Sequence, residues 1–314
     1  MIQTRLTRLL KIRYPIIQAG MSWASSNAAL PAAVSNAGGL GVIAAGPMYL
    51  DAFRATVREV KAATQGIFAV NLPLYRPQAE RFLDVIEEER VPVVIASQGG
   101  PKAHLARFHE LGIHWLHVVS TLEHAKKAAD AGVDALVVVG TEAGGHPPVN
   151  GVSTLVAVRR AVQQFTIPIV AGGGVADGYG IAALLALGAD AVQLGTRFLA
   201  TREAGVHENY KRAVLETGID GTALVGVRGL PVRMTRNSFA ARVLLADANE
   251  PDAAAYDTLF KSSSLKQAAL DGDIEWGKVE LGQSAGLIDD IPPAAEVVAR
   301  LVAEYETALA RFSG

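Results

Sequence analysis

Eight short apolar runs, rich in β-branched residues, recur along the chain and alternate with longer stretches of mixed polarity. The runs are Pro15–Gly20, Gly41–Gly46, Phe68–Leu74, Pro92–Ser97, His114–Val119, Ala135–Gly140, Pro168–Gly173 and Ala191–Thr196. A continuous apolar run of this length predicts a strand that is buried on both faces. The runs start 21 to 33 residues apart, which leaves room for one helix between successive strands. The pattern predicts an α/β fold, a (β/α)8 TIM barrel, with its chemistry at the carboxyl ends of the strands.

The intervening stretches predict helices. They are Ser26–Ala37, Leu50–Thr64, Gln78–Arg90, Lys102–Leu111, Thr121–Ala131, Thr154–Gln164 and Gly178–Leu187. Several are followed by a glycine, as at Gly112, Gly132 and Gly188. Glycine there suits the left-handed conformation with which many helices end.

The alternation stops after Phe198. The following segment has helix-like stretches at Glu208–Thr217, Asn237–Ala248 and Ala253–Lys261, without a further barrel strand. We expect residues 205–285 to form a mainly helical insertion after the eighth strand that covers the barrel mouth like a lid. Ala294–Phe312 then predicts the closing helix, so that residues 1–204 and 286–314 make up the barrel.

Composition narrows the class of protein. Half of the 314 residues are hydrophobic, the net charge is −2, and lysine and arginine are scattered, which argues against a nucleic-acid surface. No apolar run approaches the roughly 18 residues of a membrane span. No signal-peptide segment precedes Pro15, so we expect a cytoplasmic protein without membrane contact. The absence of cysteine excludes disulfides, thiolate nucleophiles and iron–sulfur clusters.

Two glycine-rich segments follow the last two predicted strands. They contain Gly172, Gly173 and Gly174 after the seventh strand, and Gln193, Gly195 and Thr196 at the end of the eighth. In barrels, the loops after these strands commonly hold a phosphate beside the N-terminus of a short helix. The alternative is that the glycines only permit tight turns. A dinucleotide-binding G-x-G-x-x-G motif is excluded, because Asp177 stands where its third glycine belongs.

A histidine stands after the sixth predicted strand, in Gly140–His146, preceded by Gly144 and Gly145. The glycines would bring backbone close to a planar ligand, and His146 suits acid–base work or the stabilisation of an anion. A lone loop histidine is more often a hydrogen-bonded structural residue. Its place at a strand end beside two glycines favours the catalytic interpretation.

Three further segments lie at the same predicted rim. Gly20, Met21 and Ser22 follow the first strand and are suited to form a backbone wall for a flat ring, or else an ordinary turn before a helix. Asn71, in the third run, and Gln98, after the fourth, carry carboxamides. Either carboxamide can bond a heteroaromatic edge or cap its own loop.

Other histidines and aspartates of the sequence do not indicate a functional site. Five histidines between positions 104 and 124 suggest a metal, but His114 lies five residues after His109, which breaks the H-E-x-x-H spacing. We therefore expect no metal site. Asp134 and Asp190 precede strands, at the bottom of the barrel, and are interpreted as stabilising residues.

Taken together, these motifs make the chain resemble the nitronate monooxygenase family, formerly called 2-nitropropane dioxygenases, which is related to the FabK-type enoyl-ACP reductases. The resemblance runs nearly end to end. It is carried by Tyr14–Met21, Val34–Gly41, Glu142–His146, Ala171–Gly178, Leu194–Phe198 and Gly282–Leu287.

The resemblance implies a non-covalent FMN. Its phosphate would lie on the glycines after strands seven and eight, with Gly20, Met21 and Ser22 along the ring, and Asn71 and Gln98 at its polar edge. His146 matches the family's active-site histidine. Pro147 and Pro148 depart from the family, since many relatives have a residue and then glycine after this histidine, and the two prolines stiffen the loop.

Three functions stay open. The first is nitronate monooxygenase activity, which consumes an alkyl nitronate and oxygen. The alternative is an NAD(P)H-dependent FMN reductase that acts on an enoyl thioester or a quinone. A third, non-redox function would use the phosphate site for a sugar phosphate or nucleotide and would give a colourless protein. A homodimer is compatible with each of the three.

Overall fold

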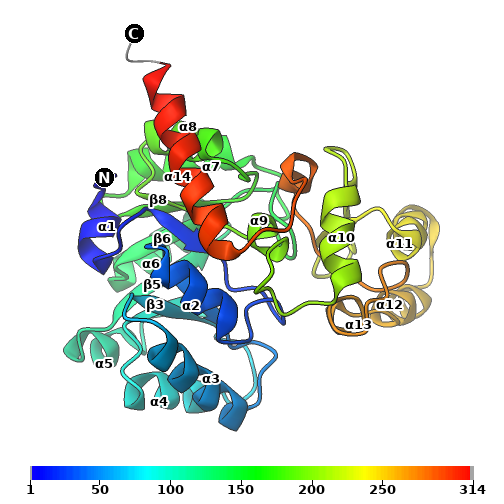
Figure 1. The fold of residues 1–314 in the computed structure, drawn as a ribbon. Helices are drawn as coiled ribbons and strands as arrows, with labels where there is room; N and C mark the ends of the chain where they lie inside the picture. The colour runs from blue at the N-terminus through cyan, green and yellow to red at the C-terminus, as the bar shows by residue number, and fades with distance from the viewer. Residues whose placement is uncertain (1, 312–314) are drawn as a thin grey trace.

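A computed structural model describes residues 2–311 and contains the predicted barrel (Figure 1). The strands are β1 (Ile16–Gln18), β2 (Gly41–Ala44), β3 (Phe68–Pro73), β4 (Val93–Ser97), β5 (His114–Val119), β6 (Ala135–Val139), β7 (Ile169–Gly172) and β8 (Ala191–Leu194). All eight are parallel in the order β1-β8-β7-β6-β5-β4-β3-β2. A bridge from Ile17 to Leu40 closes the ring between β1 and β2. The eight-stranded barrel prediction is confirmed.

The strands are continuously apolar because both of their faces are covered. One set of side chains, including Ile17, Val42 and Ile95, fills the barrel interior, and the alternate set, including Ile16, packs under the helices. This division follows the two-residue period of a strand. The short helix α1 (Arg5–Leu10), which the sequence pattern did not predict, packs apolar side chains against the interior set.

The two aspartates at the bottom of the barrel act as predicted. The Asp190 carboxylate accepts hydrogen bonds from the Arg5 guanidinium (2.6 and 2.9 Å) and from the Ile169 amide (3.0 Å). Asp134 accepts a bond from the Trp115 amide (2.7 Å). Each carboxylate thus joins neighbouring strands at their amino ends.

The barrel helices follow the predicted order, with ends that differ by up to three residues. They are α2 (Ala29–Asn36), α3 (Leu50–Ala63), α4 (Ala79–Glu88), α5 (Leu105–Glu110), α6 (Leu122–Ala131), α7 (Thr154–Gln164) and α8 (Gly178–Ala186). The closing helix α14 (Ala294–Ala310) lies against α8 and α2. Its predicted last residue, Phe312, lies outside the described residues.

The segment after β8 is mainly helical and extends to one side of the barrel (Figure 1). Its helices are α9 (Thr196–Leu199), α10 (Glu208–Glu216), α11 (Ser238–Asn249), α12 (Ala253–Lys261), α13 (Leu265–Ala269) and the 3-10 turn η1 (Gln283–Leu287). The sequence analysis missed an antiparallel hairpin, β9 (Thr222–Val225) with β10 (Val232–Thr235). The hairpin packs on α11 in a small apolar core of its own. Within residues 2–311, no helix combines the length and apolar character that a membrane crossing requires.

Candidate functional site

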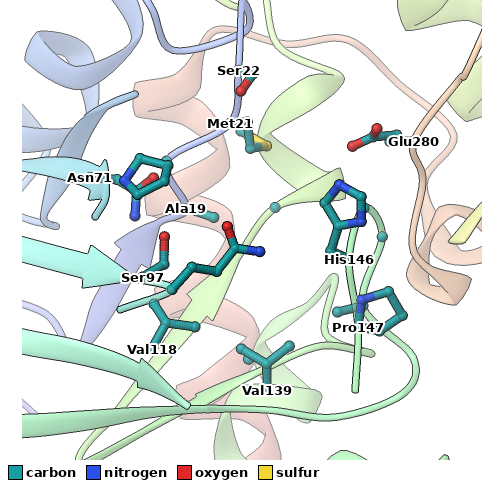
Figure 2. Close-up of a pocket in the computed structure, with 18 of the residues that line it drawn as sticks. Ala19, Met21, Ser22, Asn71, Ser97, Val118, Val139, His146, Pro147 and Glu280 are labelled. Carbon is teal, nitrogen blue, oxygen red and sulfur yellow. The ribbon is translucent and has the colours of Figure 1, made fainter. Parts of the chain in front are cut away.

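A cavity of about 1180 Å³ opens at the carboxyl ends of the barrel strands. All of the residues that the sequence analysis proposed for a site line it. They are Gly20, Met21, Ser22, Asn71, Gln98, Gly144, Gly145, His146, Gly172, Gly173, Gly174, Gln193, Gly195 and Thr196. Figure 2 shows how Met21, Asn71 and His146 surround one central space. The volume exceeds the 300–1,000 Å³ of usual ligand pockets, so it has room for more than one molecule.

Four glycines at the end of β7 and in the β8–α9 turn form one wall of the cavity. They are Gly172, Gly173, Gly174 and Gly195, and glycine is suited to these positions for two different reasons. Gly173 and Gly174 have φ angles of +104° and +75°, which side chains rarely adopt. Gly172 and Gly195 have no such backbone need, and a Cβ would meet no protein atom closer than 3.4 Å and 3.7 Å, respectively. Because Gly172 and Gly195 lack side chains, the space beside their Cα atoms is part of the cavity. These positions therefore suit a ligand group that must approach the backbone closely.

The loop after β1 packs directly on the end of β3. A Cβ at Gly20 would lie 2.3 Å from the Cβ of Asn71, so only glycine fits there. The Asn71 Nδ2 donates a hydrogen bond to the Ile95 carbonyl (2.9 Å). Since that bond uses the amide nitrogen, Asn71 presents its Oδ1 as an acceptor for a ligand.

The remaining rim residues come from the loops after β1 and β4 and from strand β8. Met21 approaches the end of β8, with its Sδ 3.7 Å from the position of a Cβ at Gly195. Ser22 faces the loop after β2, and Gln193 contributes its amide beside Gly172. Gln98 has a φ of +51°, a sparsely populated conformation for a residue other than glycine. Such strain is concentrated at functional sites.

His146 is held at the rim by the segment after β8. Its Nδ1 lies 2.9 Å from the Pro231 carbonyl oxygen. Because a carbonyl only accepts, Nδ1 carries the proton, and Nε2 is the ring nitrogen left for a ligand. The adjacent Gly145 exchanges backbone hydrogen bonds with Arg233 of β10 (2.7 and 3.1 Å). The position of this histidine thus depends on the insertion as well as on the barrel.

A second set of contacts fixes the other side of the same loop. The Glu142 carboxylate accepts hydrogen bonds from the Thr154 amide and hydroxyl (both 2.9 Å) and so anchors the loop to the start of α7. Gly282 donates to the Thr196 Oγ (3.0 Å). A Cβ at Gly144 would meet the backbone of residues 281–282 at 2.6 Å. The loop therefore has little freedom to shift.

Apart from His146, sequence reasoning did not assign the basic, imidazole and carboxylate side chains of the cavity to the site. Arg76, Lys127 and Lys266 line it together with His117, His124 and His146, against a single carboxylate, Glu280, among the described lining residues. Glu280 stands two residues before the glycine of the Gly282–Leu287 motif. This closeness to the motif is the one sequence signal by which Glu280 could have been found.

Three of these residues have perturbed pKa values. Burial lowers the pKa of the Arg76 guanidinium. Burial lowers the pKa of His117 to about 4, so this histidine is neutral near pH 7. Burial also raises the pKa of Glu280, against the opposing charges of His146 and Lys278. A perturbed carboxylate in a cleft marks a candidate functional residue.

The other histidines do not form a metal centre. Within residues 2–311 no group of three or more His, Asp or Glu side chains is arranged to hold a metal ion. His109 lies 3.0 Å and His114 3.6 Å from the Asp134 carboxylate, at the amino ends of the strands. They belong to the stabilising end of the barrel.

Comparisons with known proteins find matches over nearly the whole chain. The family model described as nitronate monooxygenase matches residues 3–82 and 78–304. A nitronate monooxygenase from Paraburkholderia phytofirmans is 35% identical, covering 97% of this chain and 95% of that protein. A 5-hydroxy-7a-methyl-1-oxo-octahydro-1H-indene-4-carboxyl-CoA dehydrogenase from Mycobacterium tuberculosis is 33% identical, covering 98% and 97%. The structure of FabK from Thermotoga maritima superposes with a TM-score of 0.93 at 38% identity, covering 100% and 99%.

Proposed function

Because this chain belongs to the nitronate monooxygenase family, we propose that it is an FMN-dependent oxidoreductase that oxidises alkyl nitronates with molecular oxygen. The family is flavin-dependent. One observation supports the proposal above the others: the open glycine positions 172 and 195 and the exposed ring of His146 face the same cavity. The chain thus offers a place for a phosphate and a place for an anionic substrate in one site.

In this proposal the glycines after β7 and in the β8–α9 turn, with Thr196, hold the FMN phosphate. Gly20, Met21 and Ser22 lie along the ring system, Asn71 and Gln98 contact its polar edge, and Gly144, Gly145 and Gln193 complete the wall. A bound FMN supplies the electron-transfer chemistry that no side chain of this chain offers. The contribution of the protein is orientation and electrostatics.

His146 is the proposed catalytic residue. With Nδ1 donating to Pro231, a second proton on the ring resides at Nε2, which then donates to an oxygen of the nitronate. A charge-assisted hydrogen bond of this kind is about twice as strong as a neutral one. The two prolines that follow, Pro147 and Pro148, are buried and limit the movement of the loop.

The insertion, residues 205–285, is proposed to shape the substrate side of the cavity. It contributes Tyr210, Leu230, Pro231 and Glu280 to the wall. The barrel ends contribute the cofactor side. This division assigns substrate choice to the segment after β8.

The test is a spectrum of the purified protein followed by two anaerobic mixings. The proposal expects bound flavin absorbance, a spectral change with a nitronate such as propionate 3-nitronate, and none with NADH or NADPH. Turnover in air should then require only nitronate and oxygen. A colourless protein that takes up no FMN would refute the assignment of FMN as the cofactor. Flavin bleaching by a nicotinamide but not by nitronate would refute the assignment of nitronate as the substrate.

A second candidate, an NAD(P)H-dependent reductase, is favoured by a different observation. The cavity is large, and its lining includes His124 and Lys127 of α6 and Lys266 of α13, with Glu280 as the one carboxylate among the described lining residues. A nitronate is too small to reach across such a space, whereas a nicotinamide dinucleotide carries phosphates that cationic side chains bind. The same anaerobic mixing with NADH and NADPH decides between the two candidates.

A further inference from the structure

Five apolar residues flank His146 at the mouth of the cavity, and all five line it. They are Pro147, Pro148 and Val149, which follow His146 in its loop, and Leu230 and Pro231 at the end of the β9–β10 turn. We call this set the apolar patch. Figure 2 shows Pro147 beside His146. The patch therefore borders the place where the substrate anion is proposed to lie.

The two halves of the apolar patch run side by side in opposite directions. Gly145 and Arg233 form an antiparallel bridge, and the His146 Nδ1 lies 2.9 Å from the Pro231 carbonyl oxygen. Continuing this register places Pro147 opposite Pro231. Proline has no backbone N–H, so the pairing does not continue as a sheet ladder, and its fixed φ angle makes both halves stiff.

The patch presents apolar side chains to the open side of the cavity. Val149 is 73% exposed and Leu230 is 52% exposed. Single exposed apolar residues are common on protein surfaces, but these two belong to one patch that lines a ligand-sized cavity. Such a surface is suited to an apolar part of a ligand, which would cover it from water.

The charged side chains next to the patch are directed elsewhere. Arg228 donates hydrogen bonds to two carbonyl oxygens at the C-terminal end of α11 (2.5 and 2.9 Å). Arg233 donates to the Thr141 carbonyl oxygen (2.8 Å). Among the described lining residues of the insertion, the charged ones are Lys266 and Glu280, and neither belongs to the patch. A substrate group that lies against the patch therefore meets apolar side chains.

We propose that the apolar patch selects the substrate: it binds the hydrocarbon chain of an alkyl nitronate whose anionic end lies at His146. Val149 and Leu230 are then specificity-determining residues. This inference deepens the function proposed above and rests on the role assigned there to His146. It implies that nitronates with longer alkyl chains are preferred to short ones, and that a second anionic group at the far end of the chain weakens binding.

The first measurement uses straight-chain carboxylates, which share with nitronates a planar anionic group with two oxygens. Butanoate, hexanoate and octanoate are titrated into the purified protein in a calorimeter, so the result does not depend on turnover. The dissociation constant should fall about two- to fourfold with each added CH2 group. Adipate, in which a second carboxylate replaces the terminal methyl group of hexanoate, should bind at least about tenfold more weakly than hexanoate.

Two variants assign the chain-length dependence to the patch. Leu230→Asn and Val149→Thr make the side chain polar at nearly unchanged size, and both positions are exposed, so the fold should tolerate the changes. In each variant the gain in affinity from butanoate to octanoate should shrink at least about threefold. Leu245→Asn and Val227→Thr are the matched controls, because Leu245 and Val227 are also exposed but are not part of the cavity lining. The controls should bind the whole series as the wild type does.

The second measurement is kcat/KM for the nitronates of nitroethane, 1-nitrobutane and 1-nitrohexane. In the wild type it should rise about two- to fourfold with each added CH2 group, as carboxylate affinity does. The rise should be smaller in Leu230→Asn and in Val149→Thr.

The outcomes separate this inference from the proposed function. A chain-length gain in carboxylate binding that the patch variants reduce, without turnover of any nitronate, supports the patch and refutes nitronate as the substrate. Equal dissociation constants along the carboxylate series, or no detectable binding of octanoate, overturn the patch, whatever the enzyme turns over. A gain that the patch variants leave unchanged, or tighter binding of adipate than of hexanoate, also overturns it.

Discussion

Replacing Gly195 by valine tests the phosphate position without disturbing the fold. Gly195 is the N-cap residue of α9 and has a φ of −97°, so the backbone accepts a side chain. A Cβ would meet the Met21 Sδ at 3.7 Å and the Ala19 Cβ at 3.9 Å, which is ordinary contact. We therefore expect the free energy of unfolding to change by less than about 1 kcal/mol.

The substitution should instead weaken the binding of FMN. The valine methyl groups would project into the space where the phosphate is proposed to meet the backbone. Hydrogen bonds to a charged group are worth about 1.5–3 kcal/mol each, and losing two of them costs about 3–6 kcal/mol. That energy corresponds to a dissociation constant for FMN about 10² to 10⁴ times higher.

The assay combines the visible-to-ultraviolet absorbance ratio of the purified variant with calorimetric titration of its apoprotein by FMN. Gly229→Val is the control, because a Cβ at Gly229 meets no atom within 4 Å and this residue is not part of the cavity lining. A Gly195→Val protein that is fully loaded and binds FMN as tightly as the wild type would refute the phosphate placement. An unfolded variant would refute the steric reasoning.

Three further changes test the proposed catalytic role of His146, the hydrogen bonds of Asp190 at the amino ends of the strands, and the buried neutral state of His117. His146→Ala should keep bound FMN but lower kcat/KM by about 10²- to 10⁴-fold; unchanged turnover would remove its catalytic role. Asp190→Ala should lower the urea-unfolding free energy by about 2–4 kcal/mol, because Arg5 loses its partner and the Ile169 amide is left unsatisfied. The pKa of His117 falls from 6.5 to about 4 on folding, so the unfolded chain takes up this proton first and stability is lost as pH falls through that window. Between pH 7 and pH 4.5 the wild type should lose about 2–3 kcal/mol more than His117→Gln in urea titrations; equal losses would contradict the buried neutral state.

The barrel could be predicted because its strands are buried on both faces and therefore appear as unbroken apolar runs. Three elements escaped prediction for physical reasons. Helix α1 has six residues, too few to show a helical period. Strands β9 and β10 contain Thr222, Arg233 and Thr235 and so do not appear as unbroken apolar runs. Their stability comes from tertiary packing, which local sequence does not record.

In the candidate site, too, some residues could be predicted from the sequence and others could not. The four glycines of the cavity wall could be predicted, because a site where a ligand must approach the backbone closely favours glycine, and glycine-rich segments are visible in the sequence. Glu280 could not, because a glutamate in an irregular stretch is usually solvated, and only the folded chain brings it next to Gly145. Arg76, His117, His124, Lys127 and Lys266 were not predicted either, because they are scattered along the sequence and only the fold brings them to one cavity.

The backbone pairing of Gly145 with Arg233 limits how this enzyme can be re-engineered. Because the insertion is proposed to shape the substrate side of the cavity, exchanging it with the corresponding segment of a relative is an obvious way to change the substrate. Here the exchange would also remove the Pro231 carbonyl that orients the His146 ring and the strand that holds its loop. A chimera should therefore retain residues 231–233 from this chain, or else import the donor's histidine loop together with its insertion.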